Sequence, residues 1–336
     1  MTHPLSRKSC RPVSGQKFTV NNVAYVLCGK LGDGAAALVR RARRIQDSTD
    51  LAIKFLAPDP KYIDEDVFDD VAARFRREGQ RAQQLSHESL VEIHAYEDNR
   101  DGAAFLDAYP KNPFILMEEV KGITLESHIR REERRRFEKN LPRAFVLTPE
   151  RLSIAAYVAQ ALQYLHKRKL VHRDVKPANI FLPATALGLQ PRPKLGDFGI
   201  MKWGDFQKSV SSGTLTVTSQ RGLGTLKYMS PEQALAPKEV TVRSDIFSLG
   251  ITLFELFTGQ ILPSHHHVFE VQSARLMRGT TPSRLLAMGY QIAEEDTGVA
   301  ELVLEMHLRG ASHRPAIDTI AGRLIWEWER RTDEKW

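Results

Sequence analysis

The sequence is poor in cysteine, has no long apolar run and contains no repeated unit. Its 336 residues include two cysteines, Cys10 and Cys28, too few for a disulfide framework, which favours a reducing compartment. The N-terminal residues carry no apolar stretch of the kind that a signal peptide needs. The longest apolar run, residues 246–259, is too short to cross a bilayer and contains Glu255, so it predicts a buried helix. We therefore expect a cytoplasmic protein without a membrane anchor or sensor domain.

Acidic residues are too few to balance the basic ones, with 41 Asp and Glu against 48 Lys and Arg and a net charge of +7. Arginines cluster at residues 40–44 and 130–136. Glutamates interleave with the second cluster, which is typical of a solvated helix face. No RNA- or DNA-binding motif accompanies the charge, which argues against a nucleic-acid partner. An acidic protein partner at residues 130–136 remains open.

The chain changes character along its length, from β-rich to mainly helical. Residues 1–17 form a basic tail that we expect to be flexible. Strand-like runs fill residues 18–57, a helical pattern follows at 58–86, and two more strand-like runs lead to about residue 119. From Thr124 the pattern is mostly helical, with a capped helix opening at residues 148–150 and a buried helix at 244–258. The sequence predicts an α+β protein with two parts that join near residues 119–122.

Two short segments of the helical part concentrate residues that suit phosphoryl transfer. The first, VHRDVKPANIF, covers residues 171–181, and the second, GDFG, covers residues 196–199. A carboxylate, an ammonium and an amide at these spacings, followed by a later Asp, are what phosphoryl transfer from ATP requires. Asp174 is placed to orient and deprotonate a substrate hydroxyl, and Lys176 can offset the charge of the transferring group. These residues predict an ATP-dependent phosphotransferase.

Three further residues complete the predicted centre in this part of the chain. Asn179 and Asp197 offer oxygen atoms to Mg²⁺, which prefers hard oxygen ligands. His172 is expected to brace the loop rather than to move protons, because Asp174 already serves as the base.

The β-rich part holds a possible phosphate-binding hairpin and a lysine. Residues 31–34, LGDG, lie between two strand-like runs, which suits a β-hairpin whose glycines let the backbone approach phosphates. Lys54 lies in an apolar strand and needs a partner for its ammonium group, either solvent at a sheet edge or phosphate oxygens and a carboxylate. Glu78, in a helical pattern, is the best carboxylate candidate.

Together these pieces resemble the eukaryotic-like (Hanks-type) Ser/Thr protein kinases, particularly the bacterial ones. The match extends from about residue 23 to residue 315 and rests on LGDG, AIKF, ILMEEVKGITL, LVHRDVKPANIF, LGDFG, GTLKYMSPEQAL, SDIFSLGITLFELFTG and HRP. The resemblance implies a bilobal kinase fold, with a small β-rich N-lobe at residues 18–119 and a larger, mainly α-helical C-lobe at 120–330. It also implies the activity of a protein serine/threonine kinase that uses ATP and Mg²⁺, with Mn²⁺ as the alternative metal.

The resemblance implies a role for each matching residue. Lys54 would pair with Glu78 and hold the α- and β-phosphates, while Asp174 would be the base and Asn179 and Asp197 the metal ligands. Thr225 would help to place the substrate hydroxyl. The residues expected around the nucleotide are Leu31, Gly32, Gly34, Val39, Ala52, Met117 as gatekeeper, Glu118 and Val120 at the hinge, and Phe181 beneath the adenine.

The family pattern also implies how the C-lobe is held and switched. Glu232 would pair with Arg314, and Asp245 would tie down the backbone of the catalytic loop. The activation segment, residues 197–232, contains seven candidate phosphorylation sites, and we expect autophosphorylation at one or more of them: Ser209, Ser211, Ser212, Thr214, Thr216, Thr218 and Ser219. Two stretches, at residues 183–193 and 130–147, look like insertions relative to the pattern, and the second is basic.

Three other functions fit parts of the same sequence. A pseudokinase would bind nucleotide or partners without transfer, but it usually lacks one of the four groups that are present here at Lys54, Asp174, Asn179 and Asp197. A small-molecule kinase is disfavoured by GTLKYMSPEQ, a run that shapes a peptide groove in the resembling family. Nucleic-acid binding through the arginine clusters is the third alternative.

Overall fold

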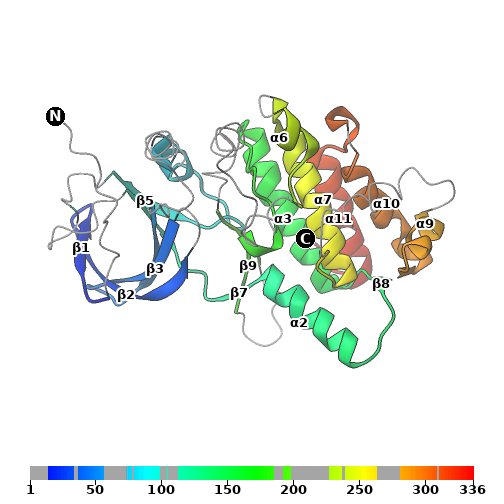
Figure 1. Ribbon diagram of the computed structural model, residues 1–336, viewed down its shortest axis with the longest axis horizontal. Helices are drawn as coiled ribbons and strands as arrows, with labels where there is room; N and C mark the ends of the chain where they lie inside the picture. The colour runs from blue at the N-terminus through cyan, green and yellow to red at the C-terminus, as the bar shows by residue number, and fades with distance from the viewer. Residues whose placement is uncertain are drawn as a thin grey trace, which may run out of the picture. The chain divides into compact units, whose positions relative to one another are not determined.

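The computed structural model describes residues 14–33, 37–56, 73, 75–77, 79–98, 104, 113–184, 192–197, 227–236, 239–262, 281–308 and 310–336. The chain forms two compact units (Figure 1). Unit 1 comprises residues 1–86, 91–119 and 200–215, and unit 2 comprises residues 87–90, 120–199 and 216–336. No helix among the described residues is long and apolar enough to cross a membrane.

Unit 1 is built on a six-stranded antiparallel sheet with the strand order β1-β2-β3-β4-β6-β5. Its strands are β1 (Lys17–Val20), β2 (Val23–Asp33), β3 (Ala37–Arg44), β4 (Asp50–Leu56), β5 (Ile93–Glu97) and β6 (Phe114–Glu118). The predicted β-rich part is therefore confirmed. The pairing of β2 with β3 also confirms the predicted hairpin at LGDG.

The predicted flexible tail is too long at its C-terminal end. The backbone N–H of Gly15 donates to the carbonyl oxygen of Leu27 at 2.7 Å, and the Ser14 hydroxyl donates to the carbonyl of Cys28 at 2.6 Å. Strand β1 begins at Lys17 and pairs with the outer edge of β2. Residues 14–17 are therefore hydrogen-bonded along β2, as an extension of the β1–β2 ladder. Residues 1–13 lie outside the described part of the chain.

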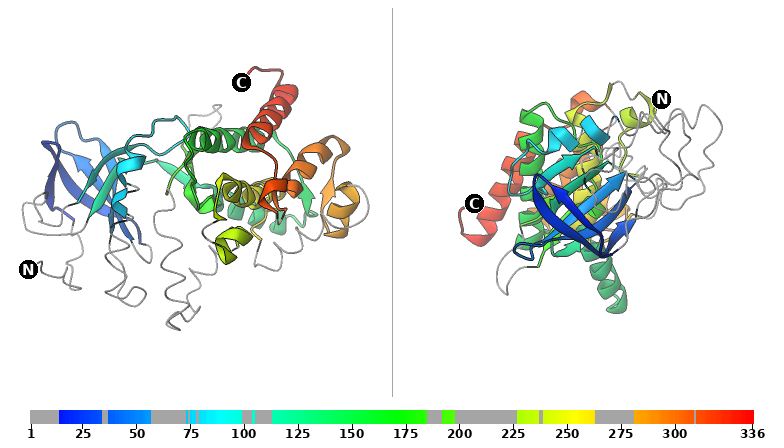
Figure 2. Two further views of the ribbon diagram at one scale, coloured as in Figure 1. Left: turned by 90° about the horizontal axis from the view of Figure 1, so that it is seen from above. Right: turned by 90° about the vertical axis from the view of Figure 1, so that its left-hand side faces the viewer.

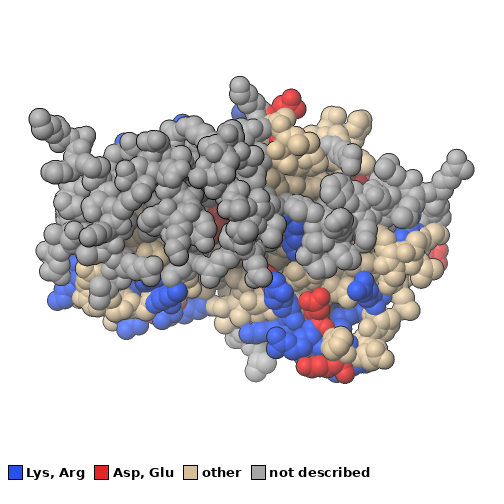
Figure 3. All heavy atoms as spheres, viewed as in Figure 1, with Lys and Arg blue, Asp and Glu red and all other residues tan. Residues whose placement is uncertain are grey.

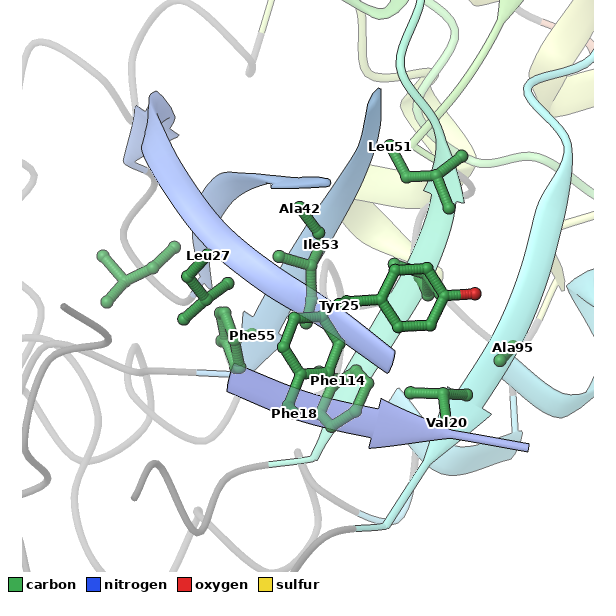
Figure 4. Packing of buried hydrophobic residues seen from close by; sticks show 12 residues of the cluster. Phe18, Val20, Tyr25, Leu27, Ala42, Leu51, Ile53, Phe55, Ala95 and Phe114 are labelled. Carbon is green, nitrogen blue, oxygen red and sulfur yellow. The ribbon is translucent and has the colours of Figure 1, made fainter. Parts of the chain in front are cut away.

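Alternation along the strands gives the sheet of unit 1 one apolar, buried face. Figure 4 shows this core, in which the ring of Phe18 lies 5.2 Å from that of Tyr25 and 5.9 Å from that of Phe114. Ile53 and Phe55 of β4 are fully buried in the same cluster. Because successive side chains of a strand point to opposite faces, the residues between them belong to the other face.

Unit 2 is mainly helical, with α3 and α7 at its centre (Figures 1 and 2). The helices are α2 (Leu125–Glu138), α3 (Pro149–Lys167), α6 (Pro231–Leu235), α7 (Val242–Thr258), α9 (Thr281–Ala287), α10 (Thr297–Met306) and α11 (Ile317–Thr332). Local sequence sets their starts: the Thr148 side chain caps α3, and the Thr241 side chain forms a capping box with Ser244 in α7. Both central helices match the sequence prediction, although α7 begins two residues before residue 244.

Short strands and turns of 3₁₀-helix connect these helices. One small sheet has the order β10-β9-β7, and a second pairs β8 with β11 in parallel. Gly122 allows β7 to approach β9, because a Cβ atom there would lie 1.9 Å from the carbonyl oxygen of Leu182. The segments are β7 (Gly122–Thr124), β8 (Ala144–Phe145), β9 (Ile180–Pro183), β10 (Lys194–Leu195), β11 (Gln291–Ile292), η1 (Pro177–Asn179), η3 (Glu294–Asp296) and η4 (Ala311–His313).

Candidate active site

The loop before η1 gathers the polar side chains that the sequence singled out. Asp174 is 8% exposed, and its Oδ2 lies 3.2 Å from the Nζ of Lys176. The Nδ2 of Asn179 donates to the same Oδ2 at 2.8 Å and to the backbone carbonyl of Asp174 at 2.8 Å. The structure thus brings these three residues together. The Lys176 ammonium and the Asn179 amide both contact the Oδ2 of Asp174. These two contacts orient the carboxylate and so set the direction in which its Oδ1 can act.

Asp245 holds the backbone of this loop from helix α7. Its Oδ2 accepts from the backbone N–H of His172 at 2.8 Å, and its Oδ1 accepts from that of Arg173 at 2.7 Å. The Oδ2 also lies 2.9 Å from the Nε2 of His166 on α3. Asp245 is completely buried, so these charge-assisted bonds act where water does not compete. The predicted role of Asp245 is confirmed.

Arg173 has a backbone conformation that needs support from both sides. Its φ of 67° lies in the left-handed region, which is costly for a residue with a Cβ. Asp245 holds its N–H, and the Nε2 of Gln233 on α6 donates to its carbonyl oxygen at 3.0 Å. This contact of Gln233 was not predicted from the sequence. Its position next to the predicted Glu232 was the only signal available.

His172 connects the loop to the segment that carries Asp197. Its Nδ1 accepts from the backbone N–H of Asp174 at 3.3 Å, and its Nε2 lies 3.2 Å from the carbonyl oxygen of Gly196. A neutral ring with its proton on Nε2 satisfies both bonds. Burial lowers the pKa of His172, which favours this neutral form. The prediction that His172 braces the loop is confirmed.

The β9–β10 pair brings the two predicted metal ligands to the same end of a ladder. Ile180 is paired with Leu195, and the N–H of Gly196 donates to the carbonyl of Asn179 at 2.9 Å. Asn179 therefore lies directly before one strand and Asp197 just after the other. Asp197 also has a positive φ of 54°, so its backbone turns sharply there.

The donor atoms at this end suit a divalent cation of the Mg²⁺ type. Asn179 makes its recorded side-chain hydrogen bonds through Nδ2, so its Oδ1 is the oxygen with which it can bind a cation. Asp197 adds carboxylate oxygens. Among the described residues, no group of three or more His, Cys, Asp or Glu side chains could hold a metal. Mg²⁺ often takes one or two carboxylates, waters and substrate phosphates as ligands.

In unit 1, four predicted nucleotide-binding residues share one face of the sheet. Val39 on β3 is paired with Lys54 on β4, and Ala52 on β4 is paired with Met117 on β6. This is the face opposite the apolar core, since Ile53 lies between Ala52 and Lys54 and points the other way.

Two of the remaining predicted nucleotide-binding residues lie on β2: Gly32 is paired with Val39, and Leu31 is 40% exposed. The other three predicted nucleotide-binding residues that the structure describes are half-buried. Glu118 ends β6, Val120 follows Glu119, and Phe181 lies in β9.

A bidentate ion pair fixes the end of β6, where the predicted hinge begins. Arg41 on β3 donates to the two carboxylate oxygens of Glu119 at 2.7 and 2.5 Å. Glu119 is largely buried, with an exposed side-chain fraction of 8%. The hydrogen bond to Glu119 raises the pKa of Arg41. In the sequence Arg41 is one of a cluster of arginines, and this contact was not predicted because it depends on the β3–β4–β6 register.

Four predictions for the site lie outside the described residues. They are Gly34, Glu78, Thr225 and the activation-segment hydroxyls at residues 209–219. Cys28 lies in β2 and has intermediate exposure.

The predicted pair of Glu232 and Arg314 is confirmed. Arg314 donates to the two carboxylate oxygens of Glu232 at 2.6 and 2.9 Å, and its side chain is completely buried. It also donates to the carbonyl oxygens of Leu308 and Arg243, at 2.7 and 2.8 Å. Burial alone would raise the pKa of Glu232, but the bonds from Arg314 and Ser244 outweigh it and leave that pKa lowered.

A second buried charged cluster was not foreseen. Glu255 on α7 is completely buried, and its Oε1 accepts from the Nζ of Lys227 at 2.6 Å and from the N–H of Leu262 at 2.8 Å. The Tyr228 hydroxyl donates to the other carboxylate oxygen at 2.7 Å. Burial raises the pKa of Tyr228 well above its ordinary value. The signal in the sequence was Glu255 itself, because a carboxylate within an apolar helix requires a partner.

Comparisons with known proteins agree with this arrangement. The protein kinase domain model matches residues 25–321. The chain is 34% identical over 241 residues to the serine/threonine-protein kinase PknB of Mycobacterium tuberculosis, covering 70% of this chain and 32% of PknB. It is 35% identical over 238 residues to PrkC of Bacillus subtilis, covering 70% of this chain and 31% of PrkC. The chain thus spans about a third of the length of these relatives.

Solved structures show the same fold. The PknI kinase domain of Mycobacterium tuberculosis aligns with a TM-score of 0.60 at 23% identity, over 96% of this chain and 99% of that one. The chain therefore belongs to the protein kinase domain family, on the bacterial Hanks-type branch that the sequence predicted.

Proposed function

We propose that this chain is an active serine/threonine kinase domain that transfers the γ-phosphate of ATP to protein hydroxyls. Protein kinases in general use ATP with a divalent metal ion and act on proteins, often including themselves. The observation that carries the proposal is the Asp174 carboxylate, held by Lys176 and Asn179 on a loop that Asp245 pins. A pseudokinase has no need to keep this set of contacts.

Asp174 would accept the proton of the substrate hydroxyl as its oxygen attacks the γ-phosphorus. The bond between that phosphorus and the β–γ bridging oxygen breaks, and ADP leaves with the bonding electrons. Lys176 would offset negative charge on the transferring group while it holds one oxygen of the Asp174 carboxylate. General-base catalysis of this kind contributes about 100- to 10,000-fold to the rate.

Asn179 and Asp197 would hold the metal ion through side-chain oxygens. Bound there, the ion would neutralise charge on the β- and γ-phosphates. Mg²⁺ is the ion we propose, with Mn²⁺ as the alternative, and titrating activity with each metal distinguishes them.

In unit 1, Lys54 would bind the α- and β-phosphates and pair with Glu78. Val39, Ala52 and Met117 would contact adenine from the face that they share with Lys54. We further propose the following contacts from the family pattern: Leu31 and Phe181 against the adenine ring, Gly32 and Gly34 at the phosphates, the backbone of Glu118 and Val120 at the hinge, and Thr225 beside the substrate hydroxyl.

We propose that autophosphorylation within residues 209–219 activates the kinase. A cytoplasmic location is a separate prediction from the sequence. We propose lobes at residues 18–119 and 120–330; the change of unit after Glu119 supports this division, while residues 87–90 belong to unit 2.

The activity is tested with purified chain, radiolabelled ATP and a generic protein substrate. We expect phosphoserine or phosphothreonine in the substrate, and a loss of about 100-fold or more in the Asp174→Asn variant. Nucleotide affinity, measured by calorimetry, should change little in that variant. The control is Asp318→Asn, an exposed carboxylate on α11 that accepts from Gln163. Wild-type chain that binds nucleotide without transferring phosphate would instead be a pseudokinase.

A further inference from the structure

Helix α2 is fixed on one side and exposed on the other. Its Leu125 and Ile129 are buried. Glu132 forms an ion pair with the buried Arg151, and the Arg136 side chain donates to the carbonyl of Pro142. These contacts hold the helix on unit 2, while its last turns extend away from α3 and α7 (Figures 1 and 2).

Two large apolar side chains are displayed at the C-terminal end of α2. Phe137 is 87% exposed and Leu141 is 52% exposed. Their backbones are ordered by the helix end, since the N–H of Asn140 donates to the carbonyl of Phe137 and that of Leu141 to the carbonyl of Arg136, each at 3.0 Å. A backbone that is already ordered loses little further conformational entropy when a partner binds.

Three exposed arginines precede these apolar residues along the chain. Arg131, Arg134 and Arg135 are exposed, and within the described part of the chain no ion pair is recorded for them. Arg130 differs, because it pairs with Glu126 at 2.7 Å. Figure 3 shows basic side chains, with acidic ones among them, over the region where Figure 1 places α2.

We propose that this surface docks an acidic segment of a partner protein that carries an apolar side chain. We call it the α2 tip and define it as Arg131, Arg134, Arg135, Phe137 and Leu141. Carboxylates of the segment would pair with the guanidinium groups, which bind carboxylates bidentately. Its apolar side chain would cover Phe137 and Leu141, so that both kinds of exposed group gain a partner. This goes beyond phosphoryl transfer and does not depend on it.

Charge and composition disfavour two other occupants. Nucleic-acid binding depends mainly on phosphate contacts, in which the two exposed apolar side chains, Phe137 and Leu141, have no role. A second copy of this chain, joined symmetrically, would bring the same basic surface against itself.

The test uses a fluorescein-labelled peptide of repeated Glu-Glu-Leu units, followed by anisotropy, with a Lys-Lys-Leu peptide for comparison. We expect the acidic peptide to bind at least about tenfold more tightly than the basic one, and less tightly as salt rises. Phe137→Ser should weaken binding about tenfold, and the double variant Arg131→Glu/Arg134→Glu should weaken it more. The matched control, Lys17→Glu/Lys167→Glu, changes two exposed lysines elsewhere and should remain within about twofold of wild type.

Thermal melting and phosphoryl transfer to a generic substrate should be unchanged in the Phe137→Ser and arginine variants, which separates this proposal from the catalytic one. Equal binding of the two peptides, or equal weakening by the lysine control, would overturn it. Displacement of the peptide by oligothymidine from both the wild type and Phe137→Ser would also overturn it, because that result would indicate a nucleic-acid site. A dimer in sedimentation that Phe137→Ser abolishes would assign the surface to a second copy instead.

Discussion

The carboxylate of Asp245 accepts a hydrogen bond of 2.7 Å from the backbone N–H of Arg173, a residue in the left-handed region of φ. The two residues lie 72 positions apart in the chain. Through this contact a buried helix determines the backbone of the catalytic loop, and the adjoining residue is Asp174. Residues far from the chemistry therefore control the geometry of the proposed base.

Asp245→Asn should slow phosphoryl transfer more than it weakens nucleotide binding. The new amide would turn N–H groups toward the donors of His172 or Arg173, leaving at least one buried donor unsatisfied at a cost of about 1–3 kcal/mol in unfolding free energy. A small displacement of a catalytic group can cost about 100-fold in rate. Steady-state kinetics and urea unfolding measure both effects. A variant with wild-type kcat would show that the loop keeps its shape without Asp245.

The stability of unit 2 should depend on His307 below neutral pH. Burial lowers the pKa of His307 to about 4, and its Nε2 has no hydrogen-bond partner among the described residues. An unfolded histidine titrates near 6.5, so between these values the unfolded state binds more protons. Stability should therefore fall as the pH drops from about 6.5 to 4, by ~3 kcal/mol from this group.

His307→Leu should remove this contribution, so that its unfolding free energy falls less steeply over the same pH range. Urea unfolding at several pH values measures the slope. His313→Gln changes an exposed histidine and is the matched control, with the wild-type slope expected. Identical slopes for wild type and His307→Leu would contradict the assignment to His307.

Lys227→Met should destabilise the protein by about 3–5 kcal/mol, because it leaves the buried Glu255 carboxylate without its ammonium partner. The double variant Lys227→Met/Glu255→Leu should recover part of that loss, since no charge then remains buried. The comparison of the single and double variants by urea unfolding gives the coupling energy. Additive effects would mean that the two side chains do not interact.

Arg314→Lys should also destabilise the protein by about 3 kcal/mol or more, since lysine cannot reproduce the bidentate contact with Glu232. The loss should be largest above pH ~4.3, the ordinary pKa of a glutamate. Glu232 has a lowered pKa in the folded protein, so its contribution is present above the unfolded value and is lost as the pH falls through the folded one. Arg323→Lys, which changes a half-exposed arginine on α11, is the control.

Local sequence was sufficient to predict several elements of the fold. Thr148 and Thr241 cap α3 and α7 through bonds made within three residues, so the helix starts could be predicted closely. The strands of unit 1 follow from alternating apolar residues, and the β2–β3 hairpin from the glycines between them. The family pattern added the pairing of Glu232 with Arg314, which composition and periodicity do not contain.

The sequence by itself determined which chemical groups the chain carries and where its main helices and strands form, because those depend on neighbours within a few residues. Tertiary structure decided the partners: Arg41 for Glu119, Lys227 for Glu255, and Gln233 for the carbonyl of Arg173. It also decided that residues 14–17 extend the sheet. Such contacts join residues distant in the chain, and only sheet register and helix packing bring them together.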